Sequence, residues 1–267
     1  MNRMLTQIAK QGRFPAFCVG ILLLSGNLAV AGSPLEELLQ RTGRTVELFW
    51  QQIDSFSCTE RVTQEKIGKK EKKEYKTDST YDYLAITKAG EEGLAIEELR
   101  LPIKRSSKKS NAPSLLSTNG FPTLLLIFHP RYQTNYRYQI KPEGDEDGRL
   151  MAVHFEQIPG RQSTCALVLQ ERIYPLALQG TAWIDAATGT IQRMTATLVS
   201  PLKDINIHAL NIEIAYKPES FSSDPESRWL PSTATINVHT ALQHWRNIHR
   251  FSQYKRFTVE SVQSVLK

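Results

Sequence analysis

The chain has 267 residues, with 33 Lys and Arg against 27 Asp and Glu, which gives a formal net charge of +6. Hydrophobic residues make up 40% of it and the mean hydropathy is −0.35, which fits a soluble globular protein and excludes a polytopic membrane protein and a disordered chain. Three Cys are too few for a disulfide-rich scaffold, and 14 Gly and 13 Pro exclude collagen-like and low-complexity sequences.

The N-terminus carries the pattern of a secretory signal peptide. Arg3, Lys10 and Arg13 form a basic segment without an acidic residue, and an apolar stretch follows at residues 17–24. Ala29-Val30-Ala31 then supplies small residues for a cleavage site after Ala31. The alternative is a transmembrane anchor, but the apolar run falls short of about 20 residues.

This pattern predicts a periplasmic or secreted protein. We expect residues 1–31 to be a cleavable signal peptide and residues 32–267 to form a single β-rich domain. The leader holds three basic and no acidic residues, so the mature chain has 30 basic against 27 acidic residues, a net charge of +3. An excess this slight does not suit nucleic-acid binding, and no nucleic-acid partner is expected.

A local basic run stands out in the mature chain. Lys104, Arg105, Lys108 and Lys109 lie in a stretch that also contains Ser, Asn and Pro, which favours a solvated loop. The alternative is peripheral membrane contact, in which these cations touch anionic lipid headgroups.

The cysteines bear on compartment and stability. Cys18 lies at the start of the leader's apolar stretch and not at its end, so we expect no lipid attachment there. Cys58 and Cys165 remain after cleavage, and in an oxidising compartment such a pair can form a disulfide. The alternative is two unrelated buried thiols. Neither has a partner at metal-ligand spacing.

The first mature segment is predicted to be an amphipathic helix. Ser33 and Pro34 suit its cap and first turn, and Glu36 and Glu37 suit the positive end of its dipole. Apolar residues then recur at spacings of three and four and form one face to bury. These residues are Leu35, Leu38, Leu39, Val46, Phe49, Trp50 and Ile53.

Three strand-like runs follow this helix. The first begins at Phe56, the second covers residues 75–87, and the third covers residues 94–101, with turns at 68–70 and 90–93 between them. Their short links predict an antiparallel meander. Tyr81 and Tyr83 lie on one side of the second run, which is rich in aromatic and hydroxyl residues.

A polar linker and a short apolar segment come next. Residues 102–118 carry two Pro and several Lys and Ser. Residues 121–128 are almost entirely apolar, with Pro122 near their start and Pro130 after their end. This arrangement predicts a buried helix of about two turns, including Leu124, Leu125 and Phe128. A buried strand is the competing interpretation.

Strand signals are dense in the rest of the chain. Turn residues separate eight candidate strands, which brings the total to about eleven without alternation of strands and helices. We therefore expect a mainly β (α+β) fold, a curved antiparallel half-barrel with the short apolar helix on its concave face. The eight candidates are 133–140, 149–158, 165–172, 179–185, 190–199, 206–216, 229–239 and 244–258.

One hairpin carries a family resemblance. Residues 180–194, GTAWIDAATGTIQRM, look like a hairpin common in the LolA/LolB-like, lipoprotein-carrier-like bacterial envelope proteins, and the layout of residues 34–260 is similar to theirs. The stretches beginning at Phe56 and at Gln243 resemble exported bacterial proteins without an assigned activity. The resemblance implies a half-open β-barrel whose hollow receives lipid acyl chains or hydrophobic polypeptide.

Residue patterns for catalysis are absent from the sequence. It contains no Gly-x-Ser-x-Gly elbow, no Gly-rich phosphate loop and no His-Glu-x-x-His motif. His239, His244 and His249 are five apart, which on a straight strand sends successive members to opposite faces. The neighbouring acids Glu97 and Glu98 would also point apart. We therefore expect no enzyme, no metal and no cofactor.

The last predicted strand contains the most specific candidates for ligand contact. Alternation places Trp245, Asn247, His249 and Phe251 on one face, with Arg246, Ile248 and Arg250 on the other. One interpretation is an ordinary strand with its aromatic residues in the core. The other is a rim in which Trp245, Arg246 and Arg250 hold an anionic amphiphile whose tails enter a dry concavity.

The leading hypothesis is an exported, non-enzymatic protein that binds a lipid or hydrophobic polypeptide in a half-barrel cavity. The first rival is an envelope sensor or scaffold that contacts a protein partner through an exposed strand edge or the basic run. The second is a structural envelope protein with a filled core. The expected ligand contacts are Tyr81, Tyr83, Leu124, Leu125, Phe128, Trp245, Arg246 and Arg250.

Overall fold

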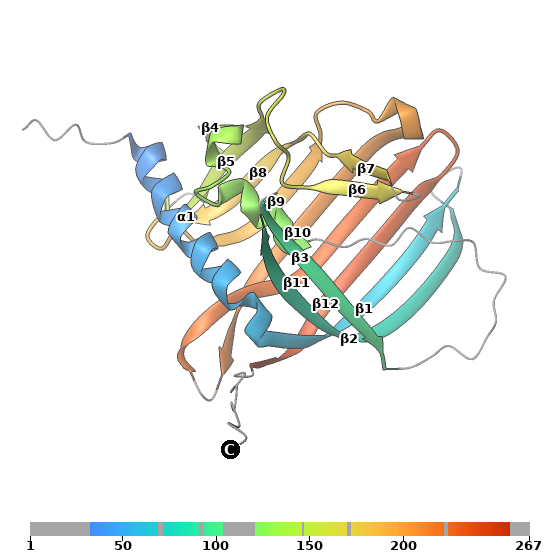
Figure 1. The fold of residues 1–267 in the computed structure, drawn as a ribbon, viewed down its shortest axis with the longest axis horizontal. Helices are drawn as coiled ribbons and strands as arrows, with labels where there is room; N and C mark the ends of the chain where they lie inside the picture. The colour runs from blue at the N-terminus through green and yellow to red at the C-terminus, as the bar shows by residue number, and fades with distance from the viewer. Residues whose placement is uncertain are drawn as a thin grey trace, which may run out of the picture. The chain divides into compact units, whose positions relative to one another are not determined.

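A long α-helix leads into a large antiparallel sheet (Figure 1). The computed structural model describes residues 33–68, 72–90, 93–103, 121–145, 147–169, 172–221 and 224–256. All of them belong to the second of the two units into which the chain divides, Gly32–Lys267. The predicted signal peptide and the basic run at residues 104–109 lie outside the described residues.

The helix α1 (Pro34–Gln52) forms where the sequence predicts it. Its cap is reciprocal, because the Ser33 hydroxyl accepts a hydrogen bond from the Glu36 backbone while the Glu36 carboxylate accepts one from the Ser33 backbone. Leu38, Val46 and Trp50 are buried on one face, as the spacing of apolar residues requires.

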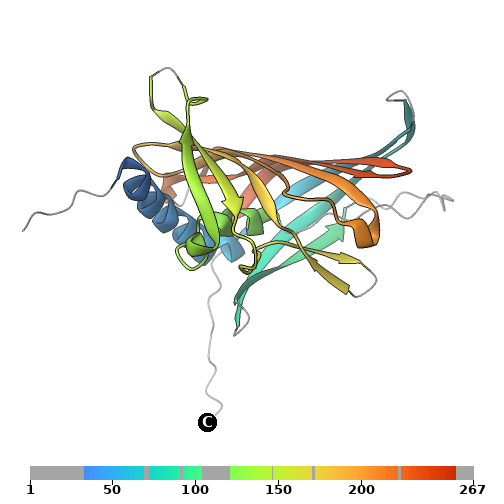
Figure 2. The same cartoon turned by 90° about the horizontal axis from the view of Figure 1, so that it is seen from above.

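Ten strands form one open, curved sheet (Figure 2). Its edges are two different strands, β3 and β4, so the sheet is not closed into a barrel. This architecture confirms the predicted curved antiparallel fold. From one edge to the other the strands are β3 (Gly93–Pro102), β2 (Lys73–Gly90), β1 (Phe56–Ile67), β12 (His244–Arg256), β11 (Asp224–Thr240), β10 (Ile207–Phe221), β9 (Ile191–Leu198), β8 (Leu178–Asp185), β5 (Leu150–Gln157) and β4 (Tyr136–Lys141).

The order of the strands confirms the meander and adds a long-range pairing. β1, β2 and β3 are consecutive neighbours, as predicted, and the hairpin β8–β9 forms over residues 178–198. β1 also pairs with β12, so the first strand after the helix lies beside the last strand of the chain. Glu60 is thereby opposite both Tyr81 and Phe251.

One predicted strand is wrong in its placement. The sequence predicts residues 165–172 as a single strand of the main sheet, but Ala166–Leu169 (β6) pairs with Arg172–Pro175 (β7) in a separate two-stranded hairpin. The apolar run 166–169 is only four residues long, and its partner strand begins at Arg172. Because β6 and β7 form a sheet of their own, β5 pairs directly with β8 in the main sheet.

The apolar segment forms a 3₁₀ helix, η3 (Phe121–Phe128), which confirms the helix and not the strand. It lies with α1 on one side of the sheet, here called the inner face, while the opposite side is the outer face (Figures 1 and 2). Ile127 and Phe128 are completely buried, and Phe128 packs edge-to-face on Phe155 of β5. The core therefore lies between the inner face, α1 and η3.

Candidate functional site

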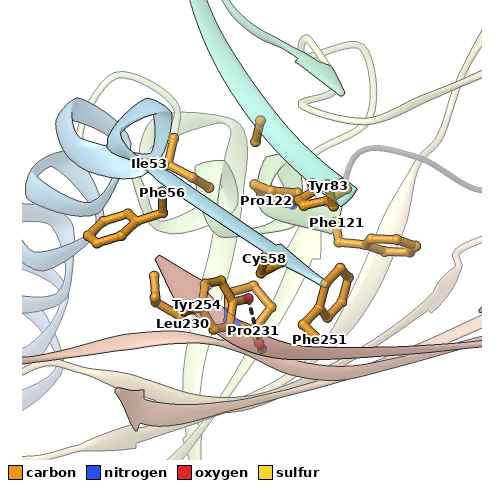
Figure 3. Close-up of a pocket in the computed structure, with 11 residues that line it drawn as sticks. Ile53, Phe56, Cys58, Tyr83, Phe121, Pro122, Leu230, Pro231, Phe251 and Tyr254 are labelled. Carbon is orange, nitrogen blue, oxygen red and sulfur yellow. Dashed lines mark hydrogen bonds between the residues drawn. The ribbon is translucent and has the colours of Figure 1, made fainter. Parts of the chain in front are cut away.

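Two adjoining hollows lie where α1, β1 and the C-terminal strands meet. The first, the α1–β11 groove, is an open depression of about 190 Å³ between the helix and the start of β11. The second, the β1–β12 cavity, is smaller, about 20 Å³, and is lined in part by the first residues of η3 (Figure 3). Phe56 and Leu230 line both hollows, so the two hollows adjoin at these side chains.

The groove is lined by equal numbers of apolar and polar residues. Leu48 is 55% exposed on α1, next to Phe49, while Trp229 and Leu230 face it from β11. Phe56 also packs on Phe221 of β10, with ring centroids 5.2 Å apart. The remaining lining residues are polar and are Thr45, Gln52, Thr190, Ser227 and Arg228.

The cavity is lined by side chains that the strand pattern sends inward. Cys58 and Tyr83 come from neighbouring positions of β1 and β2, while Phe251 and Tyr254 come from β12. Phe251 and Tyr254 are three positions apart, so on a regular strand they would face opposite sides of the sheet. A bulge in β12 opposite Ser57–Thr59, with Gln253 at φ 55°, turns both side chains inward. The Tyr254 hydroxyl is fixed by a 2.7 Å hydrogen bond to the Pro231 carbonyl (Figure 3).

The dimensions of the hollows decide what each can accept. A cavity of about 20 Å³ has room for about one water molecule, whereas drug-sized ligands occupy pockets of roughly 300–1,000 Å³. The space expected between the sheet and Leu124–Phe128 is filled by those side chains themselves. The groove, at about 190 Å³, is also below the range of drug-sized pockets, so it could hold only part of an acyl chain. The chain would enter the cavity only by displacing side chains such as Phe56.

A buried cluster of charged residues borders the cavity on the inner face. Glu60 of β1 has no exposed surface, and its carboxylate accepts hydrogen bonds from Arg100 Nε at 2.5 Å and Nη2 at 3.0 Å. His249 Nδ1 lies 2.7 Å from Glu60 Oε1. Arg100 also bonds Glu98 at 3.0 Å, and Glu98 accepts from the Tyr83 hydroxyl at 2.8 Å.

The hydrogen bonds in this cluster set its ionisation. Burial alone would raise the pKa of Glu60, but the hydrogen bonds from His249 and Arg100 outweigh burial and hold that pKa below its ordinary value. Burial would lower the pKa of Arg100, but its two carboxylate partners outweigh burial and raise that pKa, so the guanidinium keeps its charge. Burial raises the pKa of Tyr83 well above its ordinary value, so its hydroxyl stays protonated and donates to Glu98.

The structure brings together only some of the predicted ligand contacts. Tyr83 lines the cavity, and Tyr81 lies two positions away on the same face of β2. Leu124, Leu125 and Phe128 are buried in the core, and the η3 residues that line the cavity are instead Phe121 and Pro122.

The predicted alternation of the last strand is confirmed. Trp245 is buried on the inner face of β12, whereas Arg246 and Arg250 lie on the outer face. Arg246 donates to Asn237 at 3.1 Å and lies 3.6 Å from the Glu65 carboxylate. The sheet therefore separates Trp245 from both arginines, and these three residues do not form a shared rim.

Cys58 and Cys165 are free thiols in this structure, and the disulfide considered from the sequence stays a prediction. Cys58 lies in the cavity, where burial raises its pKa to about 12 against a smaller lowering by a hydrogen bond with Tyr254. Cys165 lies 3.6 Å from the Thr123 hydroxyl. Each thiol is thus packed against its own neighbours, as in the alternative of two unrelated buried cysteines.

Sequence reasoning missed Glu60, Arg100 and Leu230 as site residues. Glu60 had a signal, since it alternates with Phe56, Cys58 and Val62 on an otherwise apolar strand face. A charge in such a position needs a buried partner. The identity of that partner could not be read from the sequence, because Arg100 lies on another strand 40 residues away.

The described ranges hold neither a metal-ligand cluster nor a helix suited to a bilayer. No group of three or more His, Cys, Asp or Glu side chains there is arranged to hold a metal ion. Within the same ranges, no helix combines the length and apolar character needed to cross a membrane.

Comparison with known proteins gives distant structural similarity only. No protein-family model and no curated protein sequence matches the chain. It is similar to the crystal structure of a DUF1329 family protein from Desulfovibrio piger, with 10% identity and a TM-score of 0.42 over 86% of this chain and 96% of the other. It is also similar to a putative outer membrane lipoprotein-sorting protein domain from Vibrio parahaemolyticus, with 11% identity and a TM-score of 0.41 over 87% and 94%. With scores this low, the account of the site rests on its own geometry.

Proposed function

We propose that this protein binds the apolar part of an amphiphile, either a lipid acyl chain or a hydrophobic polypeptide segment, in the α1–β11 groove. The observation that carries the proposal is that the two hollows adjoin, since Phe56 and Leu230 line both. An apolar chain seated against Leu48 and Trp229 would extend toward the cavity if the side chains of Phe56 and Leu230 moved.

Several features support binding in place of catalysis. Half of the residues that line the groove are apolar, and the nearby ionisable groups are engaged with one another, as the contacts of Glu60 with Arg100 and His249 illustrate. Removing apolar surface from water contributes about 25 cal/mol per Å². An acyl chain would therefore gain affinity from the groove without a reacting group.

The N-terminal pattern supports an exported protein of the bacterial envelope as the setting for this role. The LolA/LolB-like resemblance of the hairpin at residues 180–194 is consistent with a lipid or lipoprotein as the cargo. In this account the partner is the hydrophobic ligand itself, and no cofactor takes part.

A fluorescent apolar probe tests the proposal. N-phenyl-1-naphthylamine, whose emission rises in apolar sites, should bind the protein and be displaced by a long-chain fatty acid. Leu48→Glu places a charge in the groove at a position that is 55% exposed, so it should fold normally and bind the probe about tenfold more weakly or worse.

Leu242→Glu is the matched control, because Leu242 is 92% exposed in the turn between β11 and β12 and lines neither hollow. Its affinity for the probe should equal that of the unaltered protein. Equal loss of affinity in both variants, or no probe binding at all, would overturn the assignment of the groove.

A further inference from the structure

The outer face of the sheet carries a row of exposed apolar side chains at its β3 edge. Leu99 is 41% exposed, Leu101 68% and Ile103 47%, and they occupy alternate positions on and just beyond the edge strand. Leu84 of β2, opposite Leu99, extends the row away from the edge of the sheet. Adjacent exposed residues of this kind form a patch, which marks an interaction surface more specifically than single exposed leucines do.

Two exposed arginines lie on the same face beside this row. Arg61 of β1 and Arg250 of β12 are directly opposite each other in the register. Thr80 of β2 is opposite Arg61, and its carbonyl accepts the hydrogen bond from the Ile103 backbone. A single cross-strand row therefore runs from Ile103 through Thr80 and Arg61 to Arg250.

The two arginines concentrate positive charge at one place on this face. Like charges directly opposite each other on neighbouring strands destabilise a sheet. Two carboxylates of β2 lie on the same face, two positions either side of Thr80. The pKa of Asp78 is lowered by its 2.6 Å hydrogen bond from the Thr63 hydroxyl and also by the charges of Lys76 and Arg61, and Asp82 lies opposite Leu101. Lys255, exposed at the far end of β12, adds a further positive charge to this face.

We propose that this outer-face patch, formed by Leu99, Leu101, Ile103, Arg61 and Arg250, docks on a lipid bilayer with anionic headgroups. The three apolar side chains would enter the boundary between headgroups and acyl chains, and the two guanidinium groups would bind lipid phosphates. Arginine suits this role because its planar fork matches the geometry of phosphate oxygens. The surface is separate from the groove, which lies on the inner side of the sheet.

The edge strand is better suited to a bilayer than to an added protein strand. Glu98 and Arg100 are inward-pointing charges on β3, and Pro102 ends the strand without an N–H donor. Inward charges and proline are devices by which edge strands avoid pairing with another chain. The exposed apolar row therefore remains available to a surface that makes no backbone hydrogen bonds.

Vesicle co-sedimentation tests the proposal. The exported protein, with its N-terminus established by intact mass, is mixed with vesicles of equal parts phosphatidylglycerol and phosphatidylcholine, or of phosphatidylcholine alone. Binding should be several-fold stronger to the anionic vesicles and should weaken as salt is raised. Arg61→Ser/Arg250→Ser and Leu101→Ser/Ile103→Ser should each reduce binding about tenfold or more.

Matched controls separate this patch from general surface effects. Arg149→Ser removes an arginine that is 79% exposed, and Leu242→Ser removes a leucine that is 92% exposed, both away from the patch. These variants should bind vesicles like the unaltered protein. Both double variants should keep the affinity for N-phenyl-1-naphthylamine, so a failure here is distinguishable from a failure of the groove.

Three results would overturn the membrane surface. One is equal binding to neutral and anionic vesicles. Another is vesicle binding that the two double variants leave unchanged, as would happen if an uncleaved leader held the protein on the vesicle. The third is a dimer that Leu101→Ser/Ile103→Ser converts to a monomer, because a second copy would then occupy the patch.

Discussion

Glu60 and His249 form a buried pair, with Nδ1 of the imidazole 2.7 Å from Oε1 of the carboxylate. The two residues are 189 positions apart in the chain, and the pairing of β1 with β12 brings them together. Phe121, the first residue of η3, packs on the His249 ring with centroids 4.5 Å apart. The pair therefore connects the charged cluster to the segment that covers the cavity.

Removing the charge of Glu60 should destabilise the fold strongly. Glu60→Gln leaves Arg100 without its bidentate carboxylate in a buried setting, which typically costs about 3–5 kcal/mol in the free energy of unfolding. Glu97→Gln is the control, since Glu97 pairs with Lys88 at the surface and should cost less than about 1 kcal/mol. Urea denaturation of both variants measures the difference, and equal losses would contradict this role for Glu60.

The same carboxylate predicts acid sensitivity. Because the folded protein holds the pKa of Glu60 below its ordinary value, the unfolded chain binds a proton first as the pH falls. The stabilisation by Glu60 should be fully present above about pH 4.5 and be lost as the pH falls toward the folded-state pKa. Glu60→Gln should show a shallower decline in stability over that range, and a parallel decline would contradict the assignment.

His129 should produce a separate pH dependence near neutrality. Burial lowers its pKa below 6.5, and its Nδ1 accepts a hydrogen bond from the Arg131 backbone, which requires the neutral ring. The unfolded chain therefore binds the proton more readily, so stability should rise with pH through about 6.5. An NMR titration should place the His129 pKa below 6.5, and His129→Gln should flatten the pH dependence of unfolding between about pH 5 and 7.

Gly189 should be indispensable for docking the β8–β9 turn on α1. Its φ is 73°, and a Cβ there would approach backbone atoms of Arg41 and Thr42 to 2.7 Å. Gly160 has a similar φ of 78°, but a Cβ at that position would meet no atom within 4 Å. Both Ala variants carry the strain of a positive φ. Gly189→Ala should therefore lose about 1–3 kcal/mol more in the free energy of unfolding than Gly160→Ala, and this difference measures the clash with the helix. Thermal or urea unfolding of the two variants measures it, and equal losses would contradict the docking role.

Thiol accessibility checks the free cysteines. Burial raises the pKa of Cys58 to about 12 and raises that of Cys165, so Ellman's reagent should react slowly with the folded protein. After denaturation without reductant, two thiols should react if the leader with Cys18 has been removed, and three if it has been retained. No reactive thiol in the cleaved protein would instead indicate the Cys58–Cys165 bridge.

Local patterns were sufficient to predict the elements whose signals are themselves local. The cap at Ser33 and the spacing of apolar residues located α1, and alternation identified both β1 and the inward residues of β12. Sequence reasoning missed the β6–β7 hairpin. Its two strands are only four residues long and close together in the chain, so local patterns predict them as part of one longer strand.

The site depends on contacts between distant parts of the chain, which alternation cannot identify. The pattern shows that Glu60 points inward, but it does not show that Arg100 and His249 meet it there. Likewise, Leu230 becomes a wall of the groove only because the β10–β11 hairpin places it beside α1.

Native mass spectrometry of the exported protein, purified without detergent, tests the central claim most directly. The account predicts a discrete added mass that organic solvent extracts, and Leu48→Glu should reduce its occupancy while Leu242→Glu should not. A mass equal to that of the polypeptide alone, before and after incubation with lipid extract, would contradict binding of a hydrophobic ligand.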